Sequence, residues 1–178
     1  MIMFIKTYKN IFWQLLKKDL FIIKNTMSDK IINSFIWTSS TIIIAEKLLP
    51  LFGLTSEYAL FIAVGSIAGC SGFEMFPKVA EFISDLEGDR HVSYKFTLPL
   101  PNWLLFIENI IAFTVNCLIL TVLTFVISKI ALWSKFDMST ICYFKLITVS
   151  LIINVFFGCF TFWIISHTKS MSKIDNVW

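Results

Sequence analysis

The sequence predicts an all-α fold, a polytopic transmembrane helix bundle with about four transmembrane helices preceded by an amphipathic helix at the membrane interface. Two observations lead to this prediction. Apolar residues make up 57% of the 178 residues and aromatic residues 16%, with a mean hydropathy of +0.78, whereas a soluble domain is only about half apolar. The apolar residues also form four runs close to the roughly 20 residues that cross a hydrocarbon core about 30 Å thick.

The first expected element is an amphipathic helix over residues 4–24. Its apolar positions recur at helical spacing, and lysine and amide side chains occupy the opposite face. This combination is typical of a helix lying at a bilayer surface, where apolar burial and anionic lipid both attract it. We therefore expect residues 1–27 to form a cytoplasmic interfacial helix and residues 28–178 the transmembrane domain. Asp19 interrupts the apolar arc, and a local contact is the only explanation that the sequence offers.

The four apolar runs are the expected membrane spans, at residues 31–49, 58–76, 104–127 and 142–165. The first run is the least apolar, since four consecutive hydroxyl residues lie inside it and Glu46 and Lys47 lie near its end. Hydroxyls can bond back to helix carbonyls, and a charged pair can lie at the interface. This run is therefore still expected to span.

The lysines and the arginine predict the orientation of the spans. Eleven of the 15 fall in segments expected on the side of the amino terminus, namely Lys6, Lys9, Lys17, Lys18, Lys24, Lys30, Lys78, Arg90, Lys95, Lys169 and Lys173. The other four are Lys47, Lys129, Lys135 and Lys145. Because an excess of Lys and Arg marks the cytoplasmic side, we expect a multi-pass protein of the plasma (inner) membrane with a cytoplasmic amino terminus.

The second span carries small residues on one face, at Gly65, Gly69 and Gly72. Such spacing lets helix backbones approach closely, so this face is expected to be buried against another helix. Pro77 is predicted to end the helix. Glu74 lies about one turn before it, where its carboxylate could reach water or Lys78, or could belong to a substrate path.

Polar residues also lie inside the third and fourth spans. The third is expected to begin with Asn102 as its amino-terminal cap, after the prolines at 99 and 101. Glu108 lies about 8 Å of helix rise beyond that cap, deep enough to need a partner. Together with Glu74, the candidates for a transport pathway or for interhelical hydrogen bonds are Glu108, Asn116 and Asn154.

The longest charged interruption between apolar runs is residues 78–103. Val79 to Leu86 is predicted to form a short amphipathic helix that Gly88 ends, with Val79, Phe82 and Ile83 on its apolar side. Its charged residues are Asp85, Glu87, Asp89 and Arg90. Spaced carboxylates bind hard cations, so a magnesium-diphosphate site of a membrane transferase is one alternative. A solvated loop or a loop that docks on a protein is the other.

At these residues the chain resembles the membrane subunit of ABC-2 type exporters. The resemblance rests on the amphipathic start with its run at residues 15–20, the stretch Asp85-Leu-Glu-Gly-Asp-Arg90, and the exit Thr97-Leu-Pro-Leu-Pro101 into the third span. It covers essentially the whole chain, but the family has six spans where this sequence supplies four. We expect an incomplete chain that lacks the last two spans, rather than spans supplied by another polypeptide.

The resemblance implies a permease subunit with no catalytic residues and no cofactor or metal of its own. ATP and Mg would be bound by a separate ABC-type ATP-binding subunit, coupled through Val79, Phe82, Ile83, Asp85, Glu87, Asp89 and Arg90. Further partners would be a second permease copy, in a homo- or heterodimer, and the lipid bilayer, with no nucleic acid. The rival interpretation is a structural or assembly membrane protein, and the transported substrate stays open.

Overall fold

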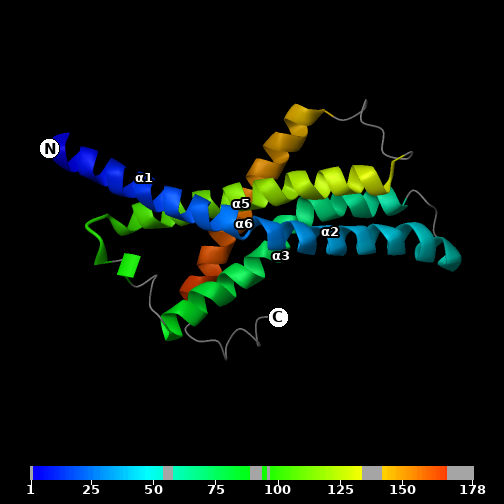
Figure 1. Cartoon of the computed structure of the whole chain (residues 1–178), viewed down its shortest axis with the longest axis horizontal. Coiled ribbons are helices and arrows are strands. Elements are labelled where there is room, and N and C mark those ends of the chain that lie inside the picture. The colour runs from blue at the N-terminus through cyan, green and yellow to red at the C-terminus, as the bar shows by residue number, and fades with distance from the viewer. Residues whose placement is uncertain (1, 54–57, 89–93, 96, 134–141, 168–178) are drawn as a thin grey trace. The chain divides into compact units, whose positions relative to one another are not determined.

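The computed structural model describes residues 2–53, 58–88, 94–95, 97–133 and 142–167. Over these residues the chain is helical and contains no strand, which confirms the predicted fold class. Its α-helices are α1 (Ile2–Asn25), α2 (Met27–Ile43), α3 (Tyr58–Glu87), α5 (Asn102–Ala131) and α6 (Tyr143–His167). A π-helix at Ile44–Leu48 and a 3-10 helix at Leu49–Phe52 extend α2 (Figure 1).

Four helical stretches in the described residues are long and apolar enough to cross a membrane, as predicted. They cover Met27–Phe52, Tyr58–Asp85, Asn102–Ala131 and Tyr143–His167. Half of the apolar window of the third stretch is buried inside the chain, against 18% to 28% for the other three. The helix α5 is therefore the candidate span with the greatest share of contacts inside the protein.

The prediction that Pro77 ends a helix was wrong. Helix α3 continues through Pro77 to Glu87, so the expected short helix after the second span is the carboxyl-terminal part of one 30-residue helix. A proline removes one backbone hydrogen bond, but helices in apolar surroundings tolerate this because neighbouring groups and small local adjustments satisfy the freed carbonyl. Gly88 does follow the last helical residue, and its amide donates to the Ser84 carbonyl at 2.9 Å.

The chain forms two compact units, and α3, α5 and α6 each contribute one part to both. The first unit comprises Met1–Lys24, Gly72–Val115 and Val155–Trp178, and the second comprises Asn25–Ser71 and Asn116–Asn154. Each unit has its own packing.

In the second unit, α2 and its π-helical extension lie beside the first part of α3 and the last part of α5 (Figure 1). Small side chains line this contact, since Ala45, Ala59 and Ala63 are completely buried with Ile42, Ile67 and Leu132. In lipid, close approach of helix backbones replaces the hydrophobic effect as the main source of association. Alanines at the contact therefore stabilise it by allowing tight van der Waals packing.

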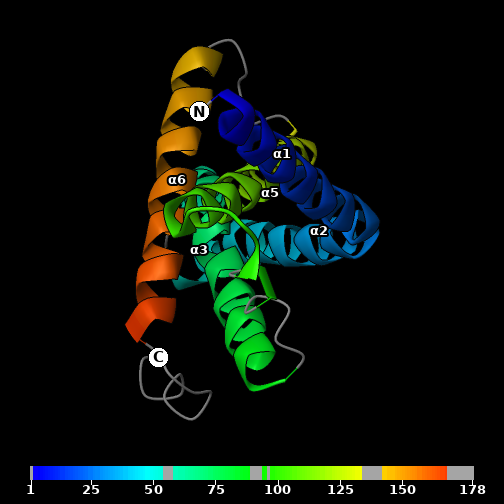
Figure 2. The ribbon, with the colours of Figure 1, turned by 90° about the vertical axis from the view of Figure 1, so that its left-hand side faces the viewer.

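In the first unit, aromatic rings join three helices. The Phe162 ring of α6 packs edge-on against Phe82 of α3, with centroids 5.4 Å apart, and against Phe106 of α5 at 6.1 Å. Figure 2 shows α5 and α6 crossing each other. The two helices are in close contact at Gly158, where an added Cβ would lie 3.3 Å from the Phe113 ring. Edge-to-face rings and a glycine contact thus fix this crossing.

Candidate functional site

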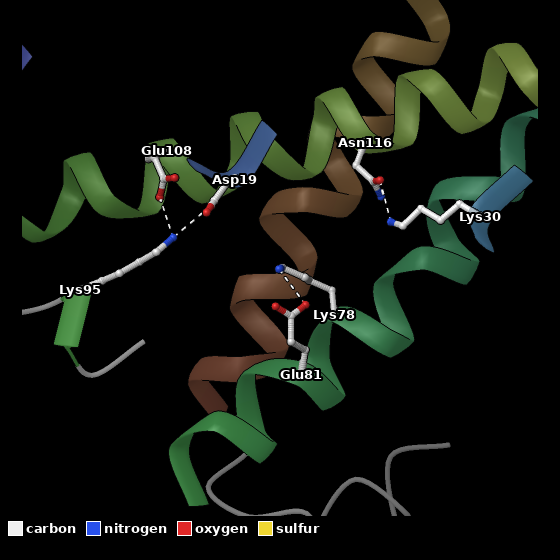
Figure 3. Close-up of polar contacts among 7 residues, drawn as sticks. All are labelled: Asp19, Lys30, Lys78, Glu81, Lys95, Glu108 and Asn116. Carbon is white, nitrogen blue, oxygen red and sulfur yellow. Dashed lines mark hydrogen bonds and ion pairs between the residues drawn. The ribbon is translucent and has the colours of Figure 1, made fainter. Parts of the chain in front are cut away.

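The most unusual polar group of the first unit is a three-residue ion cluster. The Lys95 ammonium lies 3.0 Å from a carboxylate oxygen of Asp19 in α1 and 3.3 Å from Oε2 of Glu108 in α5. Figure 3 shows both carboxylates pointing toward this one nitrogen. The cluster therefore connects the amino-terminal helix, the segment before α5 and α5 itself.

Local hydrogen bonds hold Lys95 in place. The Thr97 hydroxyl donates to the Tyr94 carbonyl at 2.8 Å, and the Leu98 amide donates to the Lys95 carbonyl at 3.3 Å. After this turn, the Leu104 amide donates to the Pro101 carbonyl at 2.9 Å, and α5 begins with Asn102 as its first helical residue. These hydrogen bonds fix the backbone at Lys95 so that its side chain reaches α1 and α5.

Burial raises the free-energy cost of ionising the groups of this cluster. The Glu108 side chain is completely buried, while those of Lys95 and Asp19 are 15% and 16% exposed. The Glu108 Oε1 atom has no hydrogen-bond partner among the described residues. Buried charges are costly unless they are paired and hydrogen-bonded, so Lys95 is the group that makes burial of these carboxyl groups tolerable.

A pocket of about 400 Å³ lies next to the cluster. It has one wall from α1 and one from the segment before α5, and its lining residues are Ile11, Gln14, Leu15, Lys18, Tyr94, Lys95 and Leu98. Lys95 belongs both to this lining and to the cluster, so the pocket borders the cluster at this lysine.

Glu108 was predicted to need a partner, and Lys95 supplies it. Sequence reasoning did not single out Lys95 and left Asp19 unexplained. The signal that could have found the cluster was Asp19 itself, because a carboxylate inside an apolar arc needs a cation when that arc is buried. Leu16, one turn before Asp19, is indeed buried.

The second unit has its own polar contacts between helices. The Lys30 ammonium of α2 donates to Asn116 Oδ1 of α5 at 2.7 Å, and the hydroxyls of Ser34 and Thr124 lie 3.5 Å apart. Asn116 thus has an interhelical bond, one of the two roles considered for it. Asn154 is buried as well, and its Nδ2 has no hydrogen-bond partner among the described residues.

The predicted coupling residues have two different environments. Val79, Phe82 and Ile83 are buried in the chain, at 1%, 7% and 1% exposure. Asp85 is half-buried, as is Glu74 earlier in the helix. The side chain of Glu87 and the whole of Asp89 and Arg90 lie outside the described residues.

The glycines of the second span differ in their surroundings. An added Cβ at Gly65 or Gly69 would meet nothing within 4 Å, whereas one at Gly72 would meet the Phe157 ring of α6 at 3.4 Å. Only the last of the three therefore lies at a helix contact in the described part of this chain. The face of Gly65 and Gly69 is open.

Metal binding has little support in the described residues, which hold no group of three His, Cys, Asp or Glu side chains placed to bind a metal. The predicted carboxylate triplet is tested only at Asp85, because the Glu87 side chain and Asp89 are not described. The four cysteines are free, and Cys70 Sγ lies 3.0 Å from the Thr121 hydroxyl.

Comparison of the chain with protein-family models, with curated proteins and with solved structures finds no match. The resemblance to ABC-2 permeases therefore rests on the residues quoted above, and what it implies is a proposal.

Proposed function

We propose that the chain is the membrane-spanning permease subunit of an ABC-2 type, ATP-driven exporter, coupled to a separate ATPase through the carboxyl-terminal part of α3. The observation that supports this best is the continuity of α3, a single helix of 30 residues from Tyr58 to Glu87. A coupling element must transmit force from a soluble partner to a span, and a helix that continues through Pro77 connects the two directly.

The length of α3 fits this role. At about 1.5 Å per residue, its 30 residues extend about 45 Å, which is longer than a hydrocarbon core of about 30 Å. About 15 Å of rigid helix would then project beyond the core on one side. With the amino terminus in the cytoplasm of a plasma (inner) membrane protein, the projecting end is the one that carries Val79 to Glu87.

The two faces of this projecting end have separate tasks in the proposal. Its buried face is attached to the bundle, because Phe82 packs on Phe162 of α6 and Val79 and Ile83 are fully covered. Its outer face carries Glu81 and Ser84, both exposed. Contacts with an ATPase would therefore involve the outer face and the charged residues that follow, while Val79, Phe82 and Ile83 would pass the movement to α6.

The helix α5 is the best candidate for the wall of a substrate pathway. It carries buried polar side chains along most of its length, including Glu108, Asn109, Asn116, Thr121, Thr124 and Ser128. Polar residues inside membrane spans are costly and often mark pathways. A pathway of this kind would form with a second permease copy, and ATP and Mg would stay on the partner ATPase.

Site-specific photo-crosslinking tests the proposal. We place a photoreactive phenylalanine derivative at Ser84 in the full-length protein in its native membrane. It should form a crosslink to an ATP-binding cassette subunit, which mass spectrometry of the crosslinked product identifies. The matched control is the same derivative at Phe144, which is 79% exposed in α6 and expected to face lipid. Reversal of charge at Arg90 (Arg90→Glu) should weaken the crosslink from Ser84.

A crosslink from Ser84 to another class of membrane protein would favour the structural or assembly role. Equal crosslinking from Ser84 and Phe144, or none from Ser84 in membranes where the protein is folded, would overturn the coupling proposal.

A further inference from the structure

We infer that Glu108 is a binding site for one exchangeable proton, held in the buried cluster with Asp19 and Lys95. The site would be present whether or not the chain couples to an ATPase, because it rests on contacts inside the first unit alone.

Charge balance is the first reason. The cluster brings two carboxyl groups to one ammonium, at 3.0 and 3.3 Å, so full ionisation leaves one excess negative charge. An uncompensated buried charge costs several kcal/mol. Within the described residues, Lys95 is the cation that contacts both Asp19 and Glu108. The part of α6 that packs nearby, residues 155–166, contains no charged residue, and Lys78 and Glu81 of α3 pair with each other at 2.9 Å.

The single ammonium that the two acids share is the second reason. Asp19 and Glu108 both contact the Lys95 nitrogen, and no hydrogen-bond donor reaches Oε1 of Glu108 among the described residues. Ionised carboxylates contain only acceptors, whereas a protonated carboxyl has one O–H donor. A single proton therefore removes the excess charge and supplies a donor that two ionised carboxyl groups lack.

Burial assigns the proton to Glu108 rather than Asp19. Glu108 is completely buried and its Oε1 has no partner among the described residues, whereas Asp19 is 16% exposed and has the shorter contact with Lys95. Ionisation is less costly for the group with more water and the closer cation. The resting arrangement is thus an Asp19–Lys95 ion pair beside a neutral Glu108 acid.

A metal cation fits the cluster less well than a proton does. Hard cations such as Ca²⁺ and Mg²⁺ take about six or more oxygen ligands, and the Lys95 ammonium already occupies the position between the two carboxyl groups. The described residues also contain no group of three side chains placed for a metal. A proton needs only one oxygen and one acceptor.

The proton can exchange through the neighbouring pocket of about 400 Å³, which Lys95 lines. On uptake, a hydronium ion gives its proton to the Glu108 carboxylate, where an O–H bond forms, and becomes water. Release follows the reverse steps, with water as the final acceptor. Loss of the proton leaves Glu108 ionised and strengthens its bond to Lys95, so the charge state of Glu108 controls how firmly the segment before α5 is held.

Carbodiimide labelling tests the site directly. Dicyclohexylcarbodiimide enters apolar regions and reacts with a protonated carboxyl group, and peptide mass mapping of the full-length protein in lipid nanodiscs locates the product. We expect labelling at Glu108, falling about tenfold per pH unit once the proton is released. Glu108→Gln should abolish the label, and Glu81→Gln, at an exposed ion pair, is the matched control that should leave it unchanged.

A second measurement does not depend on a variant that folds. Infrared difference spectra of the wild-type protein between acidic and alkaline buffer should contain the carbonyl stretch of a protonated carboxyl. Labelling of Glu108 that does not change with pH, or no labelling and no carbonyl band, would overturn the proton site. Protection of Glu108 by sodium chloride but not by choline chloride, at constant pH and ionic strength, would show that a metal cation occupies it instead.

Discussion

At the scale of single residues, Lys95 connects two buried or nearly buried carboxyl groups in the first unit. Its ammonium holds two carboxyl groups from two different helices, and all three side chains are mostly withdrawn from water. An exposed ion pair contributes only about 0 to 1 kcal/mol, but removing one partner of a buried pair costs about 3 to 5 kcal/mol. The position of Lys95, rather than the number of ion pairs, determines its contribution to stability.

We therefore expect Lys95→Met to lower the free energy of unfolding by about 3 kcal/mol, because it leaves the Asp19 carboxylate without its cation. Lys78→Met is the control, and it should cost less than about 1 kcal/mol since its partner Glu81 is 66% exposed. Unfolding by sodium dodecyl sulfate in mixed micelles measures both. Adding Asp19→Asn to Lys95→Met should restore part of the loss, and equal costs for the two lysines would contradict this role of Lys95.

The cluster could be predicted only in part from the sequence. The depth of Glu108 in its span indicated that it needs a partner, and Asp19 broke an otherwise apolar arc. Lys95 could not be identified as the cation shared by both acids. Asp19 lies 76 positions from Lys95 in the chain, and helical periodicity describes only contacts within one helix. Three-dimensional packing of α1 on the segment before α5 decides the pairing.

A second prediction at this scale concerns the bond from Lys30 to Asn116 Oδ1, at 2.7 Å. Hydrogen bonds to charged groups contribute about 1.5 to 3 kcal/mol, so Asn116→Leu should lower the free energy of unfolding by about 2 kcal/mol. Asn33→Leu is the matched control on the neighbouring helix, where Asn33 is exposed. The same micelle assay checks both, and a neutral Asn116→Leu would mean that this bond does not stabilise the α2–α5 contact.

At the scale of whole helices, hydropathy predicted where the spans lie but not where each helix ends. The expected second span stopped at residue 76 because proline usually ends helices, yet α3 continues to Glu87. Rules for helix ends come from helices whose backbone is exposed to water, and they weaken in apolar surroundings. The face formed by Gly65, Gly69 and Gly72 was also only partly predictable, since spacing cannot tell which glycine meets a neighbour.

Helix contacts at glycine lead to the third prediction. Gly158→Leu should lower the free energy of unfolding by about 1 to 3 kcal/mol, because overpacking forces neighbouring side chains away. Its Cβ would already lie 3.3 Å from Phe113 and 3.4 Å from Ile110. Gly65→Leu, with nothing within 4 Å, should have little effect on the unfolding of the monomer. A larger loss at Gly65 than at Gly158 would contradict the crossing of α5 and α6.

At the scale of the whole molecule, the described residues contain four candidate spans. We expect all four to cross the membrane, which would put Met27 and His167 on the same side. The sequence predicted these four candidate spans, since a long apolar run can be recognised without knowledge of the tertiary structure. The positions of lysine and arginine predict which side it is, and that part of the topology stays a prediction.

The final prediction therefore concerns sidedness, measured with a membrane-impermeant maleimide. Cys142 is exposed at the start of α6 and follows an expected external loop, so intact cells should label it. Thr97→Cys, at an exposed position in the expected cytoplasmic segment, should react only in inverted vesicles. Cys159 is exposed inside a candidate span and should react in neither, because lipid excludes the reagent and disfavours the thiolate. Labelling of Thr97→Cys from outside intact cells would reverse the orientation and, with it, would place the projecting end of α3 where no ATPase could reach it.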